Sequence, residues 1–581
     1  MYSNKLKTPL VACALLGVAA VSYIAYNLYN KNKKKTLLDR LKNFFSNDHE
    51  VYHNGNLSDE ESYDLVDPSD LSDFLLVEPS ESLNRSNHHH DDDRFMRYDK
   101  LHELAYIEEL TMEGQNVNIY MKNFGCSHNI SDSEYMLGLL DEYGYKIVDN
   151  MKNSHLVIIN SCTVKGPSEE GMVTQIKLAR KLGLPVIVAG CVPQSDKNNP
   201  VFNEQEISLL GVTQIDRIVE MVENSLMGRK MTLLEKKELP QLDLPKIRKD
   251  KLIEIIPLST GCLGSCTFCK TKHSRGVLGS YDIEVLLDRV ESCIEDGVKE
   301  IWLTSEDLGA YGIDIGTDIV TLLNSIVSIL PKDVMIRLGM SNPPYIKKHI
   351  NDICEILKND NVYEFIHIPV QSFSDDVLDK MNREYHVEDF IYLVDLIREK
   401  IPNCTIATDI ITGFPTETHE DHLKTKNMLE KLKLPVVNIS QFYPRKGTVA
   451  SKMKQLKNKI GKNRSREITE VFMSYETNSK YVGLEFKVYF NHINDRKQLV
   501  GHNKQYIKVI LIENKRNNNI EYNENNNTVK ENTDNKKYNN INNKYNEKEE
   551  IQQENIQKYY GTVQKVKIIN TTKWHLEGIL V

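Results

Sequence analysis

The stretch of residues 261–269, GCLGSCTFC, holds three cysteines separated by three and then by two residues. It follows an apolar, β-rich run, EIIPLST, that begins at Glu254. Three thiolates at this spacing can bind three irons of one [4Fe-4S] cluster and leave the fourth iron without a protein ligand. An open iron of this kind can bind the amino and carboxylate groups of S-adenosylmethionine (SAM).

A zinc knuckle is the alternative interpretation of the same three cysteines. Zinc sites usually pair one CxxC with a second pair nearby, and no second pair follows here. His273 is the only close candidate for a fourth ligand. We therefore favour a cluster held by Cys262, Cys266 and Cys269.

Five more apolar runs follow the one at Glu254 and predict the strands of a barrel. They are EIWLTSE from Glu300, VMIRLGM from Val334, FIHIPVQ from Phe365, TIATDIITG from Thr405 and VNISQFY from Val437. Segments of helical length lie between most of them, so a partial (β/α)6 barrel over residues 248–474, open on one side, fits the count. Each run ends in polar or glycine-rich residues, which is typical of an active-site rim.

Three further cysteines lie upstream, each at the end of a short β-rich run. The runs are NVNIYMKNFGC to Cys126, HLVIINSC to Cys162 and PVIVAGC to Cys191. Helical stretches separate them, which predicts an α/β domain with a parallel sheet over residues 113–230. Since the carboxyl ends of parallel strands meet at one edge of a sheet, we expect the three thiols to converge.

The last part of the chain changes to short alternating runs, KVYFNHI, YIKVILI and GTVQKVKII, which predict a small all-β barrel over residues 478–581. Sixteen asparagines fall within residues 514–555. This composition predicts an unstructured insertion, residues 514–558, which such a barrel tolerates at modest entropic cost. Before the barrel, residues 445–466 hold nine basic residues and no acidic one, so they can engage phosphates, although a solvated helix face is the alternative.

The N-terminal region, residues 1–35, contains a candidate membrane anchor. Residues 9–28 are uncharged and apolar enough to cross a bilayer as a helix. Lysines at positions 31 and 33–35 follow, which favours an anchor in the endoplasmic reticulum membrane with the catalytic part in the cytosol. A cleaved two-part leader that delivers the protein to a plastid-type organelle is the alternative.

Residues 36–112 predict a disordered acidic linker. Residues 48–100 hold 15 acidic and 4 basic residues, whereas the whole chain carries a formal charge of -9. The acidity therefore belongs to the linker, and the net charge does not exclude a nucleic-acid partner for the rest of the chain.

The Cx3Cx2C motif after a barrel strand resembles the radical SAM superfamily, and the upstream cysteine trio is similar to its methylthiotransferases. Further blocks resemble the eukaryotic and archaeal branch that acts on threonylcarbamoyladenosine in tRNA. They are residues 124–136 (FGCSHNISDSEYM), 160–170 (NSCTVKGPSEE), 269–276 (CKTKHSRG), 301–312 (IWLTSEDLGAYG) and 338–345 (LGMSNPPY). The terminal barrel resembles a TRAM domain, which binds RNA.

The resemblance implies two [4Fe-4S] clusters and SAM as cofactors. Cys262, Cys266 and Cys269 would hold the cluster that reduces SAM. A second cluster, from which the sulfur is transferred, would be held by Cys126, Cys162 and Cys191. The residues expected to contact SAM or substrate lie at strand ends and are Ser305, Glu306, Asp307, His367, Gln371 and Asp409.

The function implied is the addition of a methylthio group to carbon 2 of N6-threonylcarbamoyladenosine at position 37 of tRNA, next to the anticodon. Expected partners are the anticodon arm of tRNA, a reductant protein and the membrane. No DNA partner is expected, and the protein is expected to be a monomer. Two alternatives stay open: methylthiolation of isopentenyladenosine in tRNA or of a ribosomal protein, and a membrane-tethered RNA-binding iron–sulfur protein without turnover.

Overall fold

The structure, a computed structural model, describes residues 117–164, 166–202, 207–512 and 556–581. The candidate anchor, residues 1–35, and the linker, residues 36–112, lie outside these ranges, as does most of the asparagine-rich insertion. Its last residues are described, and residues 556–559 are helical. Within the described ranges, no helix has the length and apolar character needed to cross a membrane.

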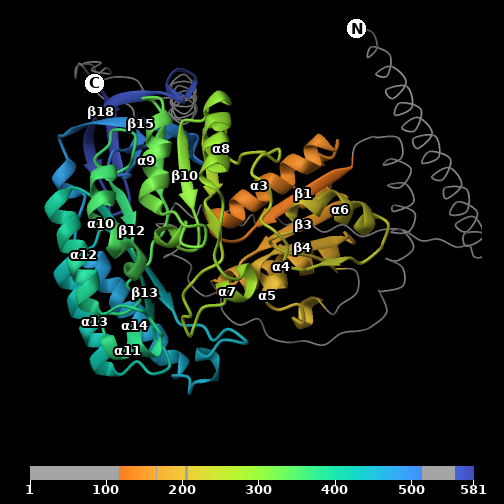
Figure 1. Ribbon diagram of the computed structural model, residues 1–581, viewed down its shortest axis with the longest axis horizontal. Coiled ribbons are helices and arrows are strands. Elements are labelled where there is room, and N and C mark those ends of the chain that lie inside the picture. Colours follow the sequence, from red (N-terminus) through yellow and green to blue (C-terminus); the bar gives the residue numbers. More distant parts are fainter. Residues whose placement is uncertain (1–116, 165, 203–206, 513–555) are drawn as a thin grey trace, which may run out of the picture. The chain divides into compact units, whose positions relative to one another are not determined.

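A six-stranded parallel sheet comes first along the described chain (Figure 1). Its strands follow the order β2-β1-β3-β4-β5-β6. They are β1 (Asn118–Asn123), β2 (Lys146–Ile147), β3 (Leu156–Ser161), β4 (Val186–Gly190), β5 (Ile207–Leu210) and β6 (Thr232–Leu233). Strand β6 lies beyond residue 230, the limit of this domain that we predicted from the sequence.

Helices cover both faces of this sheet. They are α3 (Ser127–Glu142), α4 (Gly166–Lys181), α5 (Cys191–Ser195) and α6 (Ile218–Leu226). In β3, Leu156 and Ile158 pack in one core with α3 and α6, whereas Val157 and Ile159 pack in another with α4. Because both faces are covered, the central strands are apolar throughout instead of alternating.

Six parallel strands form the second unit, and each corresponds to one of the six runs predicted from the sequence. They are β7 (Ile253–Pro257), β10 (Glu300–Thr304), β11 (Met335–Leu338), β12 (Phe365–His367), β13 (Thr405–Thr412) and β14 (Val436–Gln441). They pair in the orders β11-β10-β7 and β12-β13-β14. Single parallel bridges, Ile336 to Val362 and Met340 to His367, join the two sets. The predicted open α/β barrel is confirmed.

A helix follows each of these strands. The helices are α8 (Ile283–Glu295), α9 (Ile319–Ile329), α10 (Pro343–Leu357), α12 (Val387–Lys400), α13 (His419–Leu432) and α14 (Asn458–Ser474). Shorter elements lie at the rim: β8 (Ser259–Thr260), β9 (Gly279–Ser280), α7 (Thr271–Arg275) and α11 (Asp375–Lys380). Local sequence sets their starts: α13 begins with a capping box of Thr418 and Asp421, and α10 begins at Pro343.

The predicted all-β barrel ends the chain and is confirmed. It closes in the order β15-β16-β17-β19-β18. The strands are β15 (Glu485–Ile493), β16 (Leu499–Asn503), β17 (Lys508–Leu511), β18 (Val563–Thr571) and β19 (Leu576–Leu580). The asparagine-rich insertion joins β17 to β18, so it interrupts no strand.

Candidate active site

The first cysteine set, Cys262, Cys266 and Cys269, lies in the loop between β8 and α7. Gly261 has a φ of 80°, and a Cβ there would lie 2.2 Å from the carbonyl oxygen of Val277, so only glycine fits. A Cβ on Gly264 would lie 3.6 Å and 3.9 Å from the sulfurs of Cys262 and Cys266. Gly261 therefore turns the chain into the loop, whereas a Cβ at Gly264 would make only ordinary van der Waals contacts with the two sulfurs.

Two distant segments hold this loop in place. After α11, Arg383 donates from Nη1 to the sulfur of Cys266 at 3.0 Å, and the carbonyl of Met381 accepts from the backbone of Thr267 at 2.9 Å. After β14, Ala450 donates to the carbonyl of Thr267 at 2.9 Å. Hydrogen bonds from a positive group to a ligating sulfur stabilise the charge of a thiolate.

The second set, Cys126, Cys162 and Cys191, follows the neighbouring strands β1, β3 and β4, so its members share one edge of the first sheet. Asn129 links them: its Oδ1 accepts from the thiols of Cys126 at 3.4 Å and Cys191 at 3.9 Å. Its amide nitrogen donates to the carbonyl of Ser161, next to Cys162, at 3.1 Å. Cys162 and Cys191 are buried, and Cys126 is exposed.

Glycine also precedes two cysteines of this second set. Gly190 has a φ of 91°, and a Cβ there would lie 2.2 Å from Oδ1 of Asn160. Gly125 has a φ of 146°, and a Cβ there would lie 2.8 Å from the Cβ of Cys162. Both positions need glycine because neighbouring strand ends come close to the backbone.

Burial raises the pKa of a thiol in each set, Cys162 and Cys262, so these two thiols hold their protons in the metal-free chain. Burial, together with the thiols of Cys126 and Cys191, raises the pKa of Cys162 well above its usual range. Burial, with Asp307 and the other two thiols of the loop, raises the pKa of Cys262 to about 12. Because iron binds the thiolate, cluster binding must release these protons, so it depends on pH.

Two sets of three free thiols, one of them with a guanidinium donor aimed at a sulfur, match the number and type of protein ligands of two [4Fe-4S] clusters. The nine cysteines of the described ranges are free of disulfides. In the same ranges, no three His, Cys, Asp or Glu side chains come close enough together to hold one metal ion.

The polar turn after β10, residues 305–307, is linked to the cysteine loop through side-chain hydrogen bonds. Asp307 accepts from the backbone N–H of Asn342 at 3.1 Å and from its side-chain amide at 2.7 Å. Asn342 in turn accepts from Arg383 through its Oδ1. Burial raises the pKa of Asp307 to about 6, and Ser305 accepts from the backbone N–H of Asp307 at 3.1 Å. The chain of contacts from Asp307 thus ends on Cys266.

Glu306 points to the upstream domain. Its Oε1 lies 3.1 Å from Nδ1 of His128 and 3.3 Å from Nε of Arg275. Arg275 also contacts Asp132 at 2.5 Å, and all these side chains are buried. Although burial acts to raise it, His128 and Arg275 hold the pKa of Glu306 below its ordinary value. A contact between Glu306 and SAM stays a prediction, since the structure shows the carboxylate engaged at the domain junction.

The remaining predicted residues lie at the ends of β12 and β13. His367 Nε2 lies 3.1 Å from Oδ1 of Asp409, which also accepts from Asn438 at 2.8 Å. Gln371 has a left-handed backbone with φ of 66°, and its buried Oε1 meets no hydrogen-bond partner among the described residues. A strained backbone and an unsatisfied buried acceptor together fit a position that receives a ligand.

Arg445, after β14, lies between the two cysteine sets. It donates to the carbonyl of Phe268 at 3.3 Å. Burial lowers the pKa of its guanidinium, and the nearby thiols of Cys269 and Cys162 oppose this shift. One side chain is therefore near a cysteine of each set.

Four supporting residues were not predicted from the sequence: Asn129, Arg275, Asn342 and Arg383. Asn129, Arg275 and Asn342 lie inside the sequence blocks that resemble the methylthiotransferase family. That location was the only sequence feature that could have indicated a role for them. Arg383 lies in no motif, and only its place in space reveals its contact with Cys266.

Two family models match the chain. The radical SAM superfamily matches residues 256–429, and a family described as uncharacterized protein family UPF0004 matches residues 118–211. Among solved structures, the radical SAM methyltransferase TsrM from Kitasatospora setae is similar with a TM-score of 0.41 and 16% identity, covering 56% of this chain and 72% of that chain. The matched families and the cysteine loop define a radical SAM enzyme with a second, cysteine-bearing α/β domain.

Curated relatives narrow this class. A human protein named threonylcarbamoyladenosine tRNA methylthiotransferase is 44% identical over 77% of this chain and 80% of its own length. The protein of that name from Xenopus laevis is 47% identical over 68% and 72%, and a probable one from Pyrococcus horikoshii is 38% identical over 69% and 95%. The chain belongs to the threonylcarbamoyladenosine tRNA methylthiotransferase family. Its cofactors are SAM and two [4Fe-4S] clusters, as the sequence predicted.

Proposed function

We propose that this chain attaches a methylthio group to carbon 2 of N6-threonylcarbamoyladenosine at position 37 of tRNA. The observation that carries the proposal is the presence of both cysteine sets, with Arg445 near a cysteine of each, in a chain that matches 80% of the human relative's length. The C–H bond at carbon 2 of adenine is neither acidic nor electrophilic, so acid–base groups alone cannot activate it. Cofactors that generate a radical meet this need.

When bound, the clusters and SAM supply the electron, the hydrogen-abstracting radical and the methylthio group. The chain's own residues hold and orient these groups. Cys262, Cys266 and Cys269 form the site that faces SAM, with Arg383 stabilising the charge on one sulfur. Gln371 and the His367–Asp409 pair, at neighbouring strand ends, are positioned to bind SAM or the modified base.

The tRNA would contact the exposed basic residues between β14 and the end of α14. Seven of the nine basic residues in this run are exposed to solvent: Lys446, Lys452, Lys454, Lys457, Lys459, Lys462 and Arg466. Arg464, by contrast, is buried and donates to Glu417 at 2.6 Å, so it serves the fold. Because the same segment contacts the cysteine loop through Ala450, phosphates bound here would lie near the site. The terminal barrel would bind the anticodon arm as a TRAM-type domain.

Nucleoside analysis tests the substrate. We expect cells that lack this protein to lose 2-methylthio-N6-threonylcarbamoyladenosine and to accumulate the unmethylthiolated nucleoside, measured by mass spectrometry of digested tRNA. Re-expression of the intact chain should restore the product. An unchanged level of that product, with loss of methylthio-isopentenyladenosine instead, would assign the activity to the other tRNA base. If neither changes, a role without turnover is favoured.

Residues 1–35 would tether the enzyme to the endoplasmic reticulum membrane, with the catalytic part in the reducing cytosol, where thiolate-bound clusters persist. A reductant protein would supply the electron, and the protein would act as a monomer. We expect the full-length protein to stay in the membrane pellet after carbonate extraction, because an apolar stretch of this length is held by the bilayer core. Release of the full-length protein would contradict the anchor, and a mature N-terminus near residue 30 would favour the cleaved leader.

A further inference from the structure

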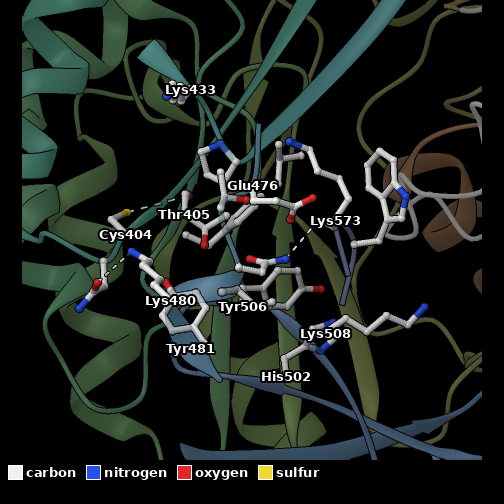
Figure 2. Close-up of a pocket in the computed structure, with 18 of the residues that line it drawn as sticks. Cys404, Thr405, Lys433, Glu476, Lys480, Tyr481, His502, Tyr506, Lys508 and Lys573 are labelled. Carbon is white, nitrogen blue, oxygen red and sulfur yellow. Dashed lines mark hydrogen bonds between the residues drawn. The ribbon is translucent and has the colours of Figure 1, made fainter. Parts of the chain in front are cut away.

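A cavity of about 380 Å³ lies where three strands of the open barrel begin, on the side opposite to the two cysteine sets. Figure 2 shows residues that line it. Phe365, Thr405 and Val436, which line it, are the first residues of β12, β13 and β14. The cysteines follow the carboxyl ends of strands, whereas these residues begin them. The terminal barrel closes the other side through β16, β17 and the turn at Trp574. The cavity is therefore separate from the site described above.

The lining of this cavity is strongly basic. Glu476 supplies its one carboxylate among the described residues. Six lysines and arginines oppose it: Arg337, Arg398, Lys433, Lys480, Lys508 and Lys573. Figure 2 shows the four lysines entering from different sides of the cavity. Like charges gathered at a partly enclosed site repel each other, and an anion between them relieves that repulsion.

Two of the cations are removed from solvent to different degrees: Lys573 is buried, and Arg337 is half-buried. Lys573 donates to the carbonyl of Tyr475 at 2.6 Å and lies over the rings of Tyr475 and Phe472. Its burial lowers the pKa to about 8, although Glu476 acts in the opposite direction. Arg337 lies 5.0 Å from the ring centre of Phe365, and its buried Nε meets no hydrogen-bond partner among the described residues.

Uncharged groups in the lining could contact the base and the ribose of a nucleotide whose phosphate binds the cations. Thr477 brings a buried hydroxyl that has no hydrogen-bond partner in the described part of the chain. Phe365, Tyr506 and Trp574 add an aromatic wall. Aromatic faces stack on bases without regard to sequence, and lysine and arginine bind phosphate. The volume also lies in the range of small-molecule sites.

We propose that this cavity binds the phosphate of a nucleotide, with the aromatic wall against its base or ribose. The phosphate belongs either to a free nucleotide or to the backbone of an RNA. Neither source requires methylthio transfer, because the cavity uses none of the cysteines or strand-end residues of the active site.

Titration of the full-length chain tests the proposal. The probes are inorganic phosphate, AMP and an RNA stem–loop with the sequence of a tRNA anticodon arm, followed by tryptophan fluorescence, since Trp574 lines the cavity. We expect Lys433→Gln/Lys480→Gln to weaken binding about tenfold, because two charges that face the phosphate are lost. Lys348→Gln/Lys431→Gln, which removes two exposed lysines that do not line the cavity, should bind as the unaltered chain does.

A tenfold loss for AMP or phosphate would identify a free nucleotide, and a loss for the RNA alone would identify backbone phosphate. Equal affinity of the two double variants for all three probes would overturn the proposal. A second measurement needs no substitution: the bound probe should protect Lys480 of the unaltered chain, which lines the cavity and is exposed, from acetylation, mapped by mass spectrometry. Equal acetylation of Lys480 with and without saturating probe would also overturn it.

Discussion

The Cys266→Ala variant is expected to lose methylthiolation by about a thousandfold or more, because one of the three ligands of the SAM-binding cluster is removed. The same change leaves the guanidinium of Arg383 without the sulfur to which it donates. Iron should fall from about eight to about four per chain after anaerobic reconstitution, since only the second cluster remains complete. Iron analysis and the yield of 5′-deoxyadenosine from SAM measure both effects.

Two further cysteine variants make this result specific. Cys354→Ala removes a buried thiol in α10 that belongs to neither set, so it should keep both clusters. Cys162→Ala should lose about four irons as well, yet retain SAM cleavage while making no methylthio product. Cys266→Ala protein that carries wild-type iron and still cleaves SAM would refute the role of this loop. Zinc bound to the unaltered chain in stoichiometric amount would favour the zinc knuckle instead.

The cysteine positions were predictable because each depends on local sequence. A cysteine that ends an apolar run lies at a strand end, and parallel strands bring their carboxyl ends to one edge. In the structure, Cys126 and Cys191, 65 residues apart in the sequence, both donate to Asn129. The glycine before Cys126, Cys191 and Cys262 is a further local signal, since each backbone turn there excludes a Cβ.

The support of the cysteine loop was not predictable, because it depends on packing between segments far apart in the chain. Asp307, Asn342 and Arg383 follow β10, β11 and β12 and meet only when those strands are neighbours. Glu306 is a second case in which contacts between distant segments could not be predicted from the sequence. Its place in a polar turn predicted a cofactor contact, whereas its contacts in space are His128 and Arg275.

The junction between the two domains depends on Arg275, which pairs with a carboxylate from each of them. It contacts Asp132 of α3 at 2.5 Å and Glu306, after β10, at 3.3 Å, with almost no solvent exposure. Arg275→Met keeps much of the side-chain volume and removes the guanidinium that both carboxylates share, while His128 stays close to them. We expect a loss of about 3–5 kcal/mol in the free energy of unfolding, the usual effect of breaking a buried pair from one side.

Arg217→Met is the matched control, because Arg217 makes a similar two-atom contact with Glu220 at the surface. Their side chains are 32% and 43% exposed, so solvent screens the pair and the loss should stay below about 1 kcal/mol. Urea denaturation of both variants, followed by circular dichroism, measures the difference. Equal losses of unfolding free energy in the two variants would show that burial at the junction does not increase the effect of removing the arginine.

The effect of Arg275→Met should depend on pH in a direction set by Glu306. In the intact chain the pKa of Glu306 is lowered, so its carboxylate stabilises the fold above its unfolded pKa, and this contribution disappears as pH falls through the folded pKa. Without Arg275, His128 remains as a group that lowers this pKa but the contribution of the guanidinium is lost, so the pKa rises and the ionised carboxylate stabilises the variant less at higher pH. The stability gap between variant and intact chain should therefore be larger at pH 8 than at pH 5. A gap that stays constant between these values would mean that lost packing, and not an uncompensated charge, accounts for the destabilisation.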